Sequence, residues 1–162
     1  MKDPFSQIEK SLTVETVIRS MEPTDLEEVL AIELPSSLVP WTRPMFLGEL
    51  FNPYAHCFVM EFSETSVRRL VGFVCFRHLS EESELLNLAV HPGYRSLGLG
   101  KRLMRFYVAS CTEAKVTRSY LEVSSSNHPA IQLYQDFAYR PAGRRLKFYR
   151  GQVDALLMLK EF

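Results

Sequence analysis

The feature that most constrains this chain is HPGYRSLGLGKRLM, residues 91–104, where glycines stand just before an expected helix. Glycine is unfavourable inside a helix, so Gly98 and Gly100 at its threshold require a reason. A ligand that must approach the backbone closely supplies one. The neighbouring Arg95 and Lys101 indicate that this ligand is an anion. The segment therefore predicts an anion site where a strand passes into a helix.

Three phosphate-binding patterns can be tested against this segment. A P-loop fails because Leu99 follows Gly98 where lysine is required. A dinucleotide-binding loop fails because Leu103 replaces its third glycine. The pattern Arg/Gln-x-x-Gly-x-Gly/Ala is matched in full by residues 95–100. Backbone N–H groups at such a helix start can bind a pyrophosphate, whereas the alternative is a flexible turn beside a solvated basic face.

The overall composition limits the partners of the chain. Its 162 residues suit one domain, and 19 basic residues balance 19 acidic ones, so we expect neither nucleic acid nor membrane as a partner. The beginning of the sequence lacks the pattern of a secretory signal, and no apolar run approaches the roughly 20 residues of a spanning helix. Cys57, Cys75 and Cys111 form no metal-binding pair, which favours buried reduced thiols in a cytoplasmic protein without a metal site.

Hydrophobic periodicity predicts one mixed α/β domain over residues 13–162, after a polar extension formed by residues 1–12. Thr24 and Glu27 suit a capping box at the start of the first helix. The sheet is expected to be mostly antiparallel. In chain order, the expected elements are strand 13–21, helix 22–33, a short helix near 45–51, strands 56–62, 68–79 and 83–91, helix 98–112, strand 118–125, helix 128–137, and a closing hairpin of 139–150 with 152–160.

Two long stretches resemble a known family. LNLAVHPGYRSLGLGKRLM resembles the acetyl-CoA-binding motif of the GNAT superfamily of N-acetyltransferases, and YLEVSSSNHPAIQLYQDFAYRPAGRR resembles the motif that follows it. PWTRPMF, LEVSSSNHPAIQLY, RRLKFY and DALLMLK together resemble RimI-type enzymes, which acetylate the N-terminal alanine of a ribosomal small-subunit protein. The resemblance covers nearly the whole chain after residue 12.

The resemblance implies a fold and a cofactor. The fold is a mostly antiparallel sheet of about seven strands with about four helices, in which the parallel central strands 83–90 and 118–124 splay apart. The pantetheine arm of acetyl-CoA would lie in this splay, and the pyrophosphate would lie on the N–H groups of the glycine segment. Asn127 either binds the pantetheine amide or caps the following helix. The implied cofactor-binding residues are Leu88, Ala89, Val90, Arg95, Ser96, Leu97, Gly98, Leu99, Gly100, Lys101, Asn127 and Tyr134.

The resemblance also implies two catalytic residues. Glu122 corresponds to the base that accepts the proton of the amine, directly or through a water, and Tyr134 corresponds to the acid that protonates the thiolate. Strand alternation supports this, because Leu121 and Val123 would face the core and leave Glu122 toward the splay. An exposed glutamate in a salt bridge and a packed helix tyrosine are the alternatives. The backbone N–H of Val90 would stabilise the oxyanion.

The acceptor is expected to be the N-terminal α-amine of a protein, as in RimI-type enzymes. Trp41 and Tyr149 would form opposite walls of a peptide groove, and Glu33 would bind the free amine or a second residue. The connection RGQ is shorter than the corresponding turn of RimI-type enzymes. A small-molecule amine, a lysine side chain, or a non-catalytic acyl-CoA sensor are the alternatives, and the presence of both Glu122 and Tyr134 argues against the sensor. A monomer and a homodimer are both compatible with the sequence.

Overall fold

The structure is a computed structural model in which residues 15–63 and 68–162 are described. The expected extension, residues 1–12, and the beginning of the expected first strand lie outside the described residues. The other expected strands and helices are confirmed, with shifts of a few residues at their ends. Because the periodicity of hydrophobic residues along the chain is a strong local signal, these elements could be located from the sequence.

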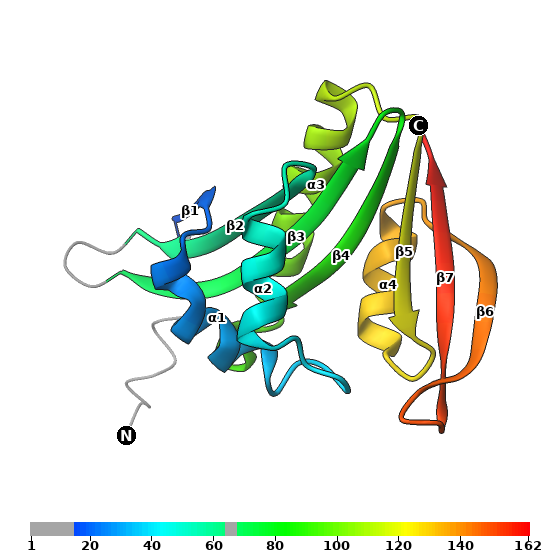
Figure 1. The fold of residues 1–162 in the computed structure, drawn as a ribbon, viewed down its shortest axis with the longest axis horizontal. Helices are drawn as coiled ribbons and strands as arrows, with labels where there is room; N and C mark the ends of the chain where they lie inside the picture. Colours follow the sequence, from blue (N-terminus) through cyan, green and yellow to red (C-terminus); the bar gives the residue numbers. More distant parts are fainter. Residues whose placement is uncertain (1–14, 64–67) are drawn as a thin grey trace, which may run out of the picture.

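Seven strands of the described residues form one sheet in the order β1-β2-β3-β4-β5-β7-β6 (Figure 1). Neighbouring strands are antiparallel except for β4 and β5, which run parallel, so the predicted fold class is confirmed. The strands are β1 Thr16–Ser20, β2 Ala55–Phe62, β3 Arg69–Leu79, β4 Glu82–Val90, β5 Arg118–Ser124, β6 Arg140–Tyr149 and β7 Val153–Glu161. The α-helices are α1 Leu26–Glu33, α2 Arg43–Leu50, α3 Leu99–Glu113 and α4 His128–Asp136.

Hydrophobic cores lie on both faces of the sheet. Helices α1 and α2 pack on one face, and α3 and α4 pack on the other (Figure 1). Strand β3 serves both cores because its side chains alternate: Val74 and Phe76 face α3, whereas Phe73 and Cys75 face α1 and α2. A strand buried on both faces is a rigid support for the neighbouring β4.

The parallel pair β4 and β5 separates after a short contact. Pairing runs from Glu82 opposite Arg118 to Leu85 opposite Leu121 and then ends. Strand β4 carries a bulge at this point, because Leu86 is an extra residue in its register with β3. Beyond it, β4 continues to pair with β3, and β5 continues to pair with β7. The predicted splay is therefore present.

Gly72 of β3 holds the far end of β4 in place. A Cβ atom at this position would lie 2.9 Å from the carbonyl oxygen of Ala89 and 3.1 Å from Cδ1 of Leu103. The first distance is shorter than real Cβ atoms show and is to a backbone atom, so a side chain at this position would force β3 and β4 apart. Strand β4 and helix α3, which follow each other along the chain, are thereby fixed against the same point of β3.

The prediction for the start of α1 is wrong. A 3-10 turn, Pro23–Asp25, precedes the helix, and the N–H of Glu22 donates to Oδ2 of Asp25 at 2.8 Å, so Thr24 and Glu27 do not form the expected capping box. The reason is a distant arginine. The guanidinium of Arg19 donates to both oxygens of Asp25, at 2.8 and 2.9 Å, and thereby holds this carboxylate at the turn.

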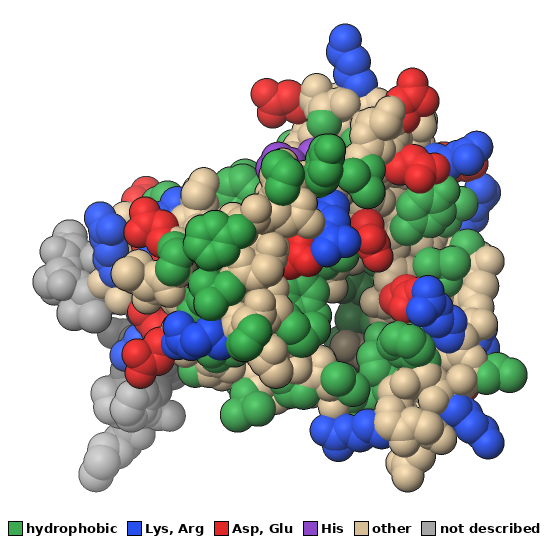
Figure 2. All heavy atoms as spheres, in the orientation of Figure 1, with side chains coloured by type: hydrophobic (Ala, Val, Ile, Leu, Met, Phe, Trp, Pro, Cys, Tyr) green, Lys and Arg blue, Asp and Glu red, His purple; other side chains and the backbone are tan. Residues whose placement is uncertain are grey.

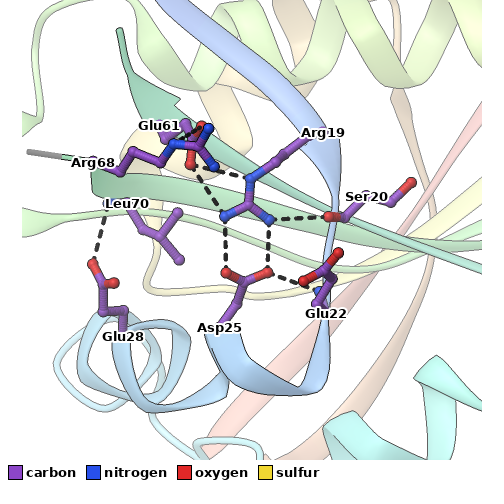
Figure 3. A network of polar contacts seen from close by, with 8 residues as sticks. All are labelled: Arg19, Ser20, Glu22, Asp25, Glu28, Glu61, Arg68 and Leu70. Atoms are coloured by element: carbon purple, nitrogen blue, oxygen red, sulfur yellow. Dashed lines mark hydrogen bonds and ion pairs between the residues drawn. The ribbon is translucent and has the colours of Figure 1, made fainter. Parts of the chain in front are cut away.

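Arg19 is the centre of a polar network that joins β1 to β2 and α1 (Figure 3). Its Nε also donates to Oε2 of Glu61 at 3.1 Å, and the Arg68 guanidinium lies 3.9 Å from the other oxygen of Glu61. We call Arg19, Asp25, Glu61 and Arg68 the Arg19 cluster. Its partly buried carboxylates are all paired with guanidinium groups, so it fastens the first turn of the helical layer to the sheet.

Candidate active site

The end of β4 presents an unpaired edge to the splay. The N–H of His91 donates to the carbonyl oxygen of Val71 at 2.8 Å. Hydrogen-bonded and non-hydrogen-bonded pairs alternate along an antiparallel ladder, so the backbone groups of Leu88 and Val90 point away from β3. Among the described residues, no strand pairs with this edge. An extended ligand with amide groups can therefore bind here as an additional strand does.

Helix α3 begins at the tip of this edge. Gly98 is its N-cap residue and has a left-handed backbone with φ of +78°. Glycine adopts this conformation without strain. Because a Cβ at this position would meet nothing within 4 Å, glycine is favoured here by the backbone conformation and not by a lack of space. The first turn of this 15-residue helix contains no acidic side chain. Its free N–H groups and the positive end of its dipole fit a pyrophosphate.

The basic side chains of the glycine segment contact the protein itself. The Arg95 guanidinium donates from Nη2 to Oγ of Ser36 at 2.9 Å and from Nε to the carbonyl oxygen of Val90 at 3.3 Å. The Lys101 ammonium lies 3.1 Å from Asp136 at the surface. The sequence pattern suggested that these charges serve an anion. That role stays a prediction. In the structure, Arg95 links the segment to the loop between α1 and α2.

The splay opens into a groove with a volume of about 780 Å³. The space-filling view shows a hollow between the part of the molecule that carries α1 and α2 and the part that carries β5, β6 and β7 (Figure 2). Predicted site residues that meet on its wall are Glu33, Trp41, Leu88, Ala89, Glu122, Asn127, Tyr134 and Tyr149. The others, Val90 and residues 95–101, are not part of this lining and follow Ala89 along the chain.

Sequence reasoning missed several wall residues. Among the described residues, three glutamates and no lysine, arginine or histidine line the groove, so the wall is acidic, although Arg145 lies 3.0 Å from one of the three, Glu122. Glu84 is the glutamate that was not predicted. It lies on β4 before the bulge, where no motif marks it. The further lining residues that were not predicted are residues 35–39, Met45, Leu85, Leu86, Asn87, Leu121, Val123, Ser124, Ser126, Pro129 and Phe148.

Glu122 lies on the groove wall and is also part of an ion pair. Its neighbours Leu121 and Val123 are buried in the core that α3 covers, so strand alternation turns Glu122 to the other face of the sheet, and all three residues reach the groove at the splay. Its Oε1 lies 3.0 Å from Nη2 of Arg145 on β6. Glu122 is therefore both a residue of the splay and a salt-bridged residue of the strand.

Tyr134 of α4 provides a protonated hydroxyl at the groove. The residue is buried, and its ring packs edge-on against Tyr139 with centroids 6.1 Å apart. Burial, together with the nearby Tyr149, raises the pKa of Tyr134 to about 12. A phenol with such a pKa is neutral at pH 7 and can donate its proton. Burial and the charge of Glu122 raise the pKa of Tyr149 in the same direction.

Glu33 is a buried carboxylate at the end of α1. It is 1% exposed, and its Oε1 accepts the N–H of Trp41 at 2.9 Å. Its Oε2 has no hydrogen-bond partner among the residues that the structure describes. Burial raises the pKa of Glu33, and the Trp41 N–H and the nearby Asn87 amide partly oppose this. A buried oxygen without a partner on a groove wall fits a donor group supplied by a ligand.

Trp41 and Asn127 each combine a structural contact with a place on the groove. The Trp41 ring packs edge-on against Phe46, with centroids 5.1 Å apart, and also lines the groove. Oδ1 of Asn127 accepts the N–H of Ala130 at 3.2 Å, so this side chain caps α4. Asn127 therefore caps α4, which is one of its two predicted roles. Binding of the pantetheine amide, the other role, stays a prediction.

The fold and this site match a known family. The Acetyltransferase (GNAT) family model matches residues 25–139, which is most of the chain. The chain belongs to this family. It is an N-acetyltransferase with acetyl-CoA as the acetyl donor. Among the described residues, no helix is both long and apolar enough to cross a membrane.

Curated relatives have closely similar lengths. A protein of Bacillus subtilis (strain 168), provisionally named a ribosomal protein bS18-alanine N-acetyltransferase, is 36% identical over 149 residues, which cover 91% of this chain and 96% of the relative. The ribosomal protein bS18-alanine N-acetyltransferase of Escherichia coli (strain K12) is 30% identical over 144 residues, covering 87% and 94%. The crystal structure of the ribosomal-protein-S18-alanine N-acetyltransferase from Escherichia coli has a TM-score of 0.80 at 27% identity, covering 91% and 94%.

Proposed function

We propose that this enzyme acetylates the N-terminal α-amine of a protein, and that a ribosomal protein with an N-terminal alanine is its acceptor. The names of the similar enzymes support this acceptor. The observation that carries the proposal is the groove of about 780 Å³, which brings Glu122 and Tyr134 to one wall beside the open edge of β4. A groove open to solvent admits the end of a polypeptide, whose remaining residues stay outside.

The donor would be held by the backbone of two segments. Acetyl-CoA supplies the acetyl thioester when it is bound. The outward-facing groups of Leu88 and Val90 would hold its pantetheine amides, and residues 95–101 at the start of α3 would hold its pyrophosphate. The Val90 N–H would also donate to the oxyanion. The positive φ of Gly98 and the absence of acidic side chains in the first turn of α3 fit this assignment.

Glu122 would act as the general base. An N-terminal amine has a pKa of about 7.7–8.0, so about one molecule in ten is neutral at pH 7. A carboxylate on the groove wall is then sufficient to take the proton, directly or through a water. Tyr134 would donate its proton to the leaving thiolate. The phenol is protonated at pH 7, so its proton is available to the leaving thiolate.

The acceptor would bind between the two walls of the groove. Trp41 lies on one side and Tyr149 on the other. The unpartnered Oε2 of Glu33 and the acidic wall favour a positively charged amine over a neutral or anionic acceptor. We assign the protein to the cytoplasm, where ribosomal proteins are made. Neither nucleic acid nor membrane is part of the proposal, and both a monomer and a homodimer fit it.

Mass spectrometry of a peptide panel tests the acceptor. Peptides that differ only in an N-terminal alanine, serine or methionine are incubated with acetyl-CoA, beside an N-terminally blocked peptide with an internal lysine. We expect acetylation at the terminal amine, fastest for alanine, and none on the blocked peptide. Acetylation of the lysine side chain or of small amines alone would contradict the proposal. Binding of acetyl-CoA without any transfer would favour the sensor.

A further inference from the structure

Strand β6 has an irregular register beside the groove. It lies at the edge of the sheet and pairs with β7. Arg145 is opposite Ala155, but Tyr149 is opposite Val153, so β6 contains two more residues than β7 over this stretch. Such an irregularity changes the direction in which the following side chains point. Here it lies within the segment that brings Phe148 and Tyr149 to the groove wall.

A carboxylate fixes this irregular segment. Oδ1 of Asp154 on β7 accepts the N–H of Lys147 at 2.8 Å, and Lys147 has a left-handed backbone with φ of +51°. Oδ2 of the same carboxylate lies 3.0 Å from Nη1 of Arg144. The backbone hydrogen bond to Lys147 therefore holds the segment that carries Arg145 without Glu122, and the ion pair of Arg144 is an additional contact at the surface.

Arg145 makes two contacts on the groove side of this segment. Its Nη2 lies 3.0 Å from Oε1 of Glu122, and its guanidinium carbon lies 5.3 Å from the ring centroid of Phe148. The stack on Phe148 limits the directions that the guanidinium can adopt. The distance recorded for this ion pair is the one to Oε1, and the structure records no hydrogen bond to Oε2 from the described residues.

We propose that Arg145 is a positioning residue for Glu122: it holds Oε1 so that Oε2 faces the acceptor amine. The inference rests on the proposed function, in which Glu122 is the base. The terminal torsion of a glutamate is broad, so an unheld carboxylate samples many orientations, and proton transfer needs one of them. An ion pair of 3.0 Å with one oxygen restricts this torsion. The arginine therefore acts through Glu122 and does not touch the reacting atoms.

The ion pair contributes little to folding, which makes it a clean target. The side chain of Arg145 is 62% exposed and that of Glu122 is 26% exposed. Exposed pairs contribute about 0–1 kcal/mol to stability. Substitution of Arg145 should therefore leave the melting temperature almost unchanged. The neighbouring Arg144 offers a matched control, because it is on the same strand and its ion pair with Asp154 has the same length of 3.0 Å.

Steady-state kinetics with the best peptide of the panel test the inference. We expect Arg145→Gln to lower kcat about tenfold, a loss typical of a misplaced catalytic group, with an unchanged acetyl-CoA affinity by calorimetry. Arg145→Lys should recover part of kcat, and Arg144→Gln should behave as the wild type. In an E122Q background, R145Q should cause no further loss of kcat, because the two residues act as one unit.

Three outcomes would overturn the inference. One is a kcat of R145Q within twofold of the wild type. Another is an equal loss in R144Q, which would indicate a general disturbance of the hairpin. The third is a further loss of kcat in the E122Q background, which would give Arg145 a role of its own. A wild type that acetylates no peptide amine would remove the proposed function and this inference together, whereas an active wild type with an equally active R145Q would remove the inference alone.

Discussion

The Arg19 cluster and the groove both contain carboxylates that are shielded from solvent, but the partners of these carboxylates differ. In the cluster, Asp25 is 9% exposed, and its two oxygens accept hydrogen bonds from Arg19 and from the N–H of Glu22. The hydrogen bonds from Arg19 hold the pKa of Asp25 below its usual range. In the groove, Glu33 is 1% exposed, one of its oxygens has no hydrogen-bond partner in the described part of the chain, and burial raises its pKa.

This difference separates groups that stabilise the fold from groups that await a ligand. A buried carboxylate with all of its hydrogen bonds made contributes to stability, whereas one with an unpartnered oxygen costs free energy until a donor arrives. Figure 3 shows the first kind, in which charged side chains of β1, β2 and the first helical turn converge. Glu33 in the groove is of the second kind. We therefore expect substitutions in the two regions to affect different measurements.

The largest expected effect belongs to Glu122→Gln. The glutamine keeps the shape of the side chain but accepts a proton very poorly, so kcat should fall about 100-fold, at the low end of losses for a general base. Acetyl-CoA affinity by calorimetry and the melting temperature should change little, because the partner in its ion pair, Arg145, is 62% exposed. An unchanged kcat with peptide acceptors would show that Glu122 is not the general base and would weaken the distinction between the groove and the Arg19 cluster.

The Asp25→Asn substitution should have the opposite profile. It weakens the paired hydrogen bonds of Arg19, so the free energy of unfolding should fall by about 2 kcal/mol in a urea titration, with kcat unchanged. Because the pKa of Asp25 is lowered in the folded state, its stabilisation is present above the usual aspartate pKa and is lost on further acidification. The free energy of unfolding of the variant should therefore fall less on acidification than that of the wild type.

A surface glutamate provides the control for Asp25. Glu161 pairs with Arg140 at 2.8 Å, and both side chains are more than half exposed. Glu161→Gln should cause no measurable change in the urea titration. Equal losses in the Asp25 and Glu161 variants would mean that the Arg19 cluster has no special role in stability.

The smallest expected effect belongs to Glu33→Gln. The glutamine still accepts the N–H of Trp41 but loses the charge, so KM for the peptide should rise about fivefold, which corresponds to about 1 kcal/mol. The raised pKa of Glu33 means that wild-type stability falls as the pH rises above the usual glutamate range. The variant should therefore be the more stable protein at pH 8, with the difference disappearing toward pH 4. A KM equal to that of the wild type would exclude Glu33 from acceptor binding.

Short-range patterns explain what could be predicted from the sequence. The amphipathic spacing of α3 and the glycines before it identified the end of β4 and the beginning of the helix. Alternation along β5 placed Glu122 on the side opposite to Leu121 and Val123. Each of these inferences uses residues that are close in the sequence.

Long-range contacts explain what could not be predicted. The start of α1 depends on Arg19, which comes from β1 and holds Asp25, so local capping preferences led to the wrong residues. The ion pair between Glu122 and Arg145 depends on the pairing of both β5 and β6 with β7, which places Glu122 opposite Leu157 and Arg145 opposite Ala155. A register between strands is set by the whole sheet, and no local motif in this sequence marks it.

A crystal structure with bound acetyl-CoA tests most directly whether the open edge of β4 and the start of α3 form the donor site. We expect the diphosphate density on the N–H groups of residues 95–101 and the pantetheine density between β4 and β5, alongside Leu88 and Val90. Density for the nucleotide at any other place on the molecule, with this edge empty, would contradict the account.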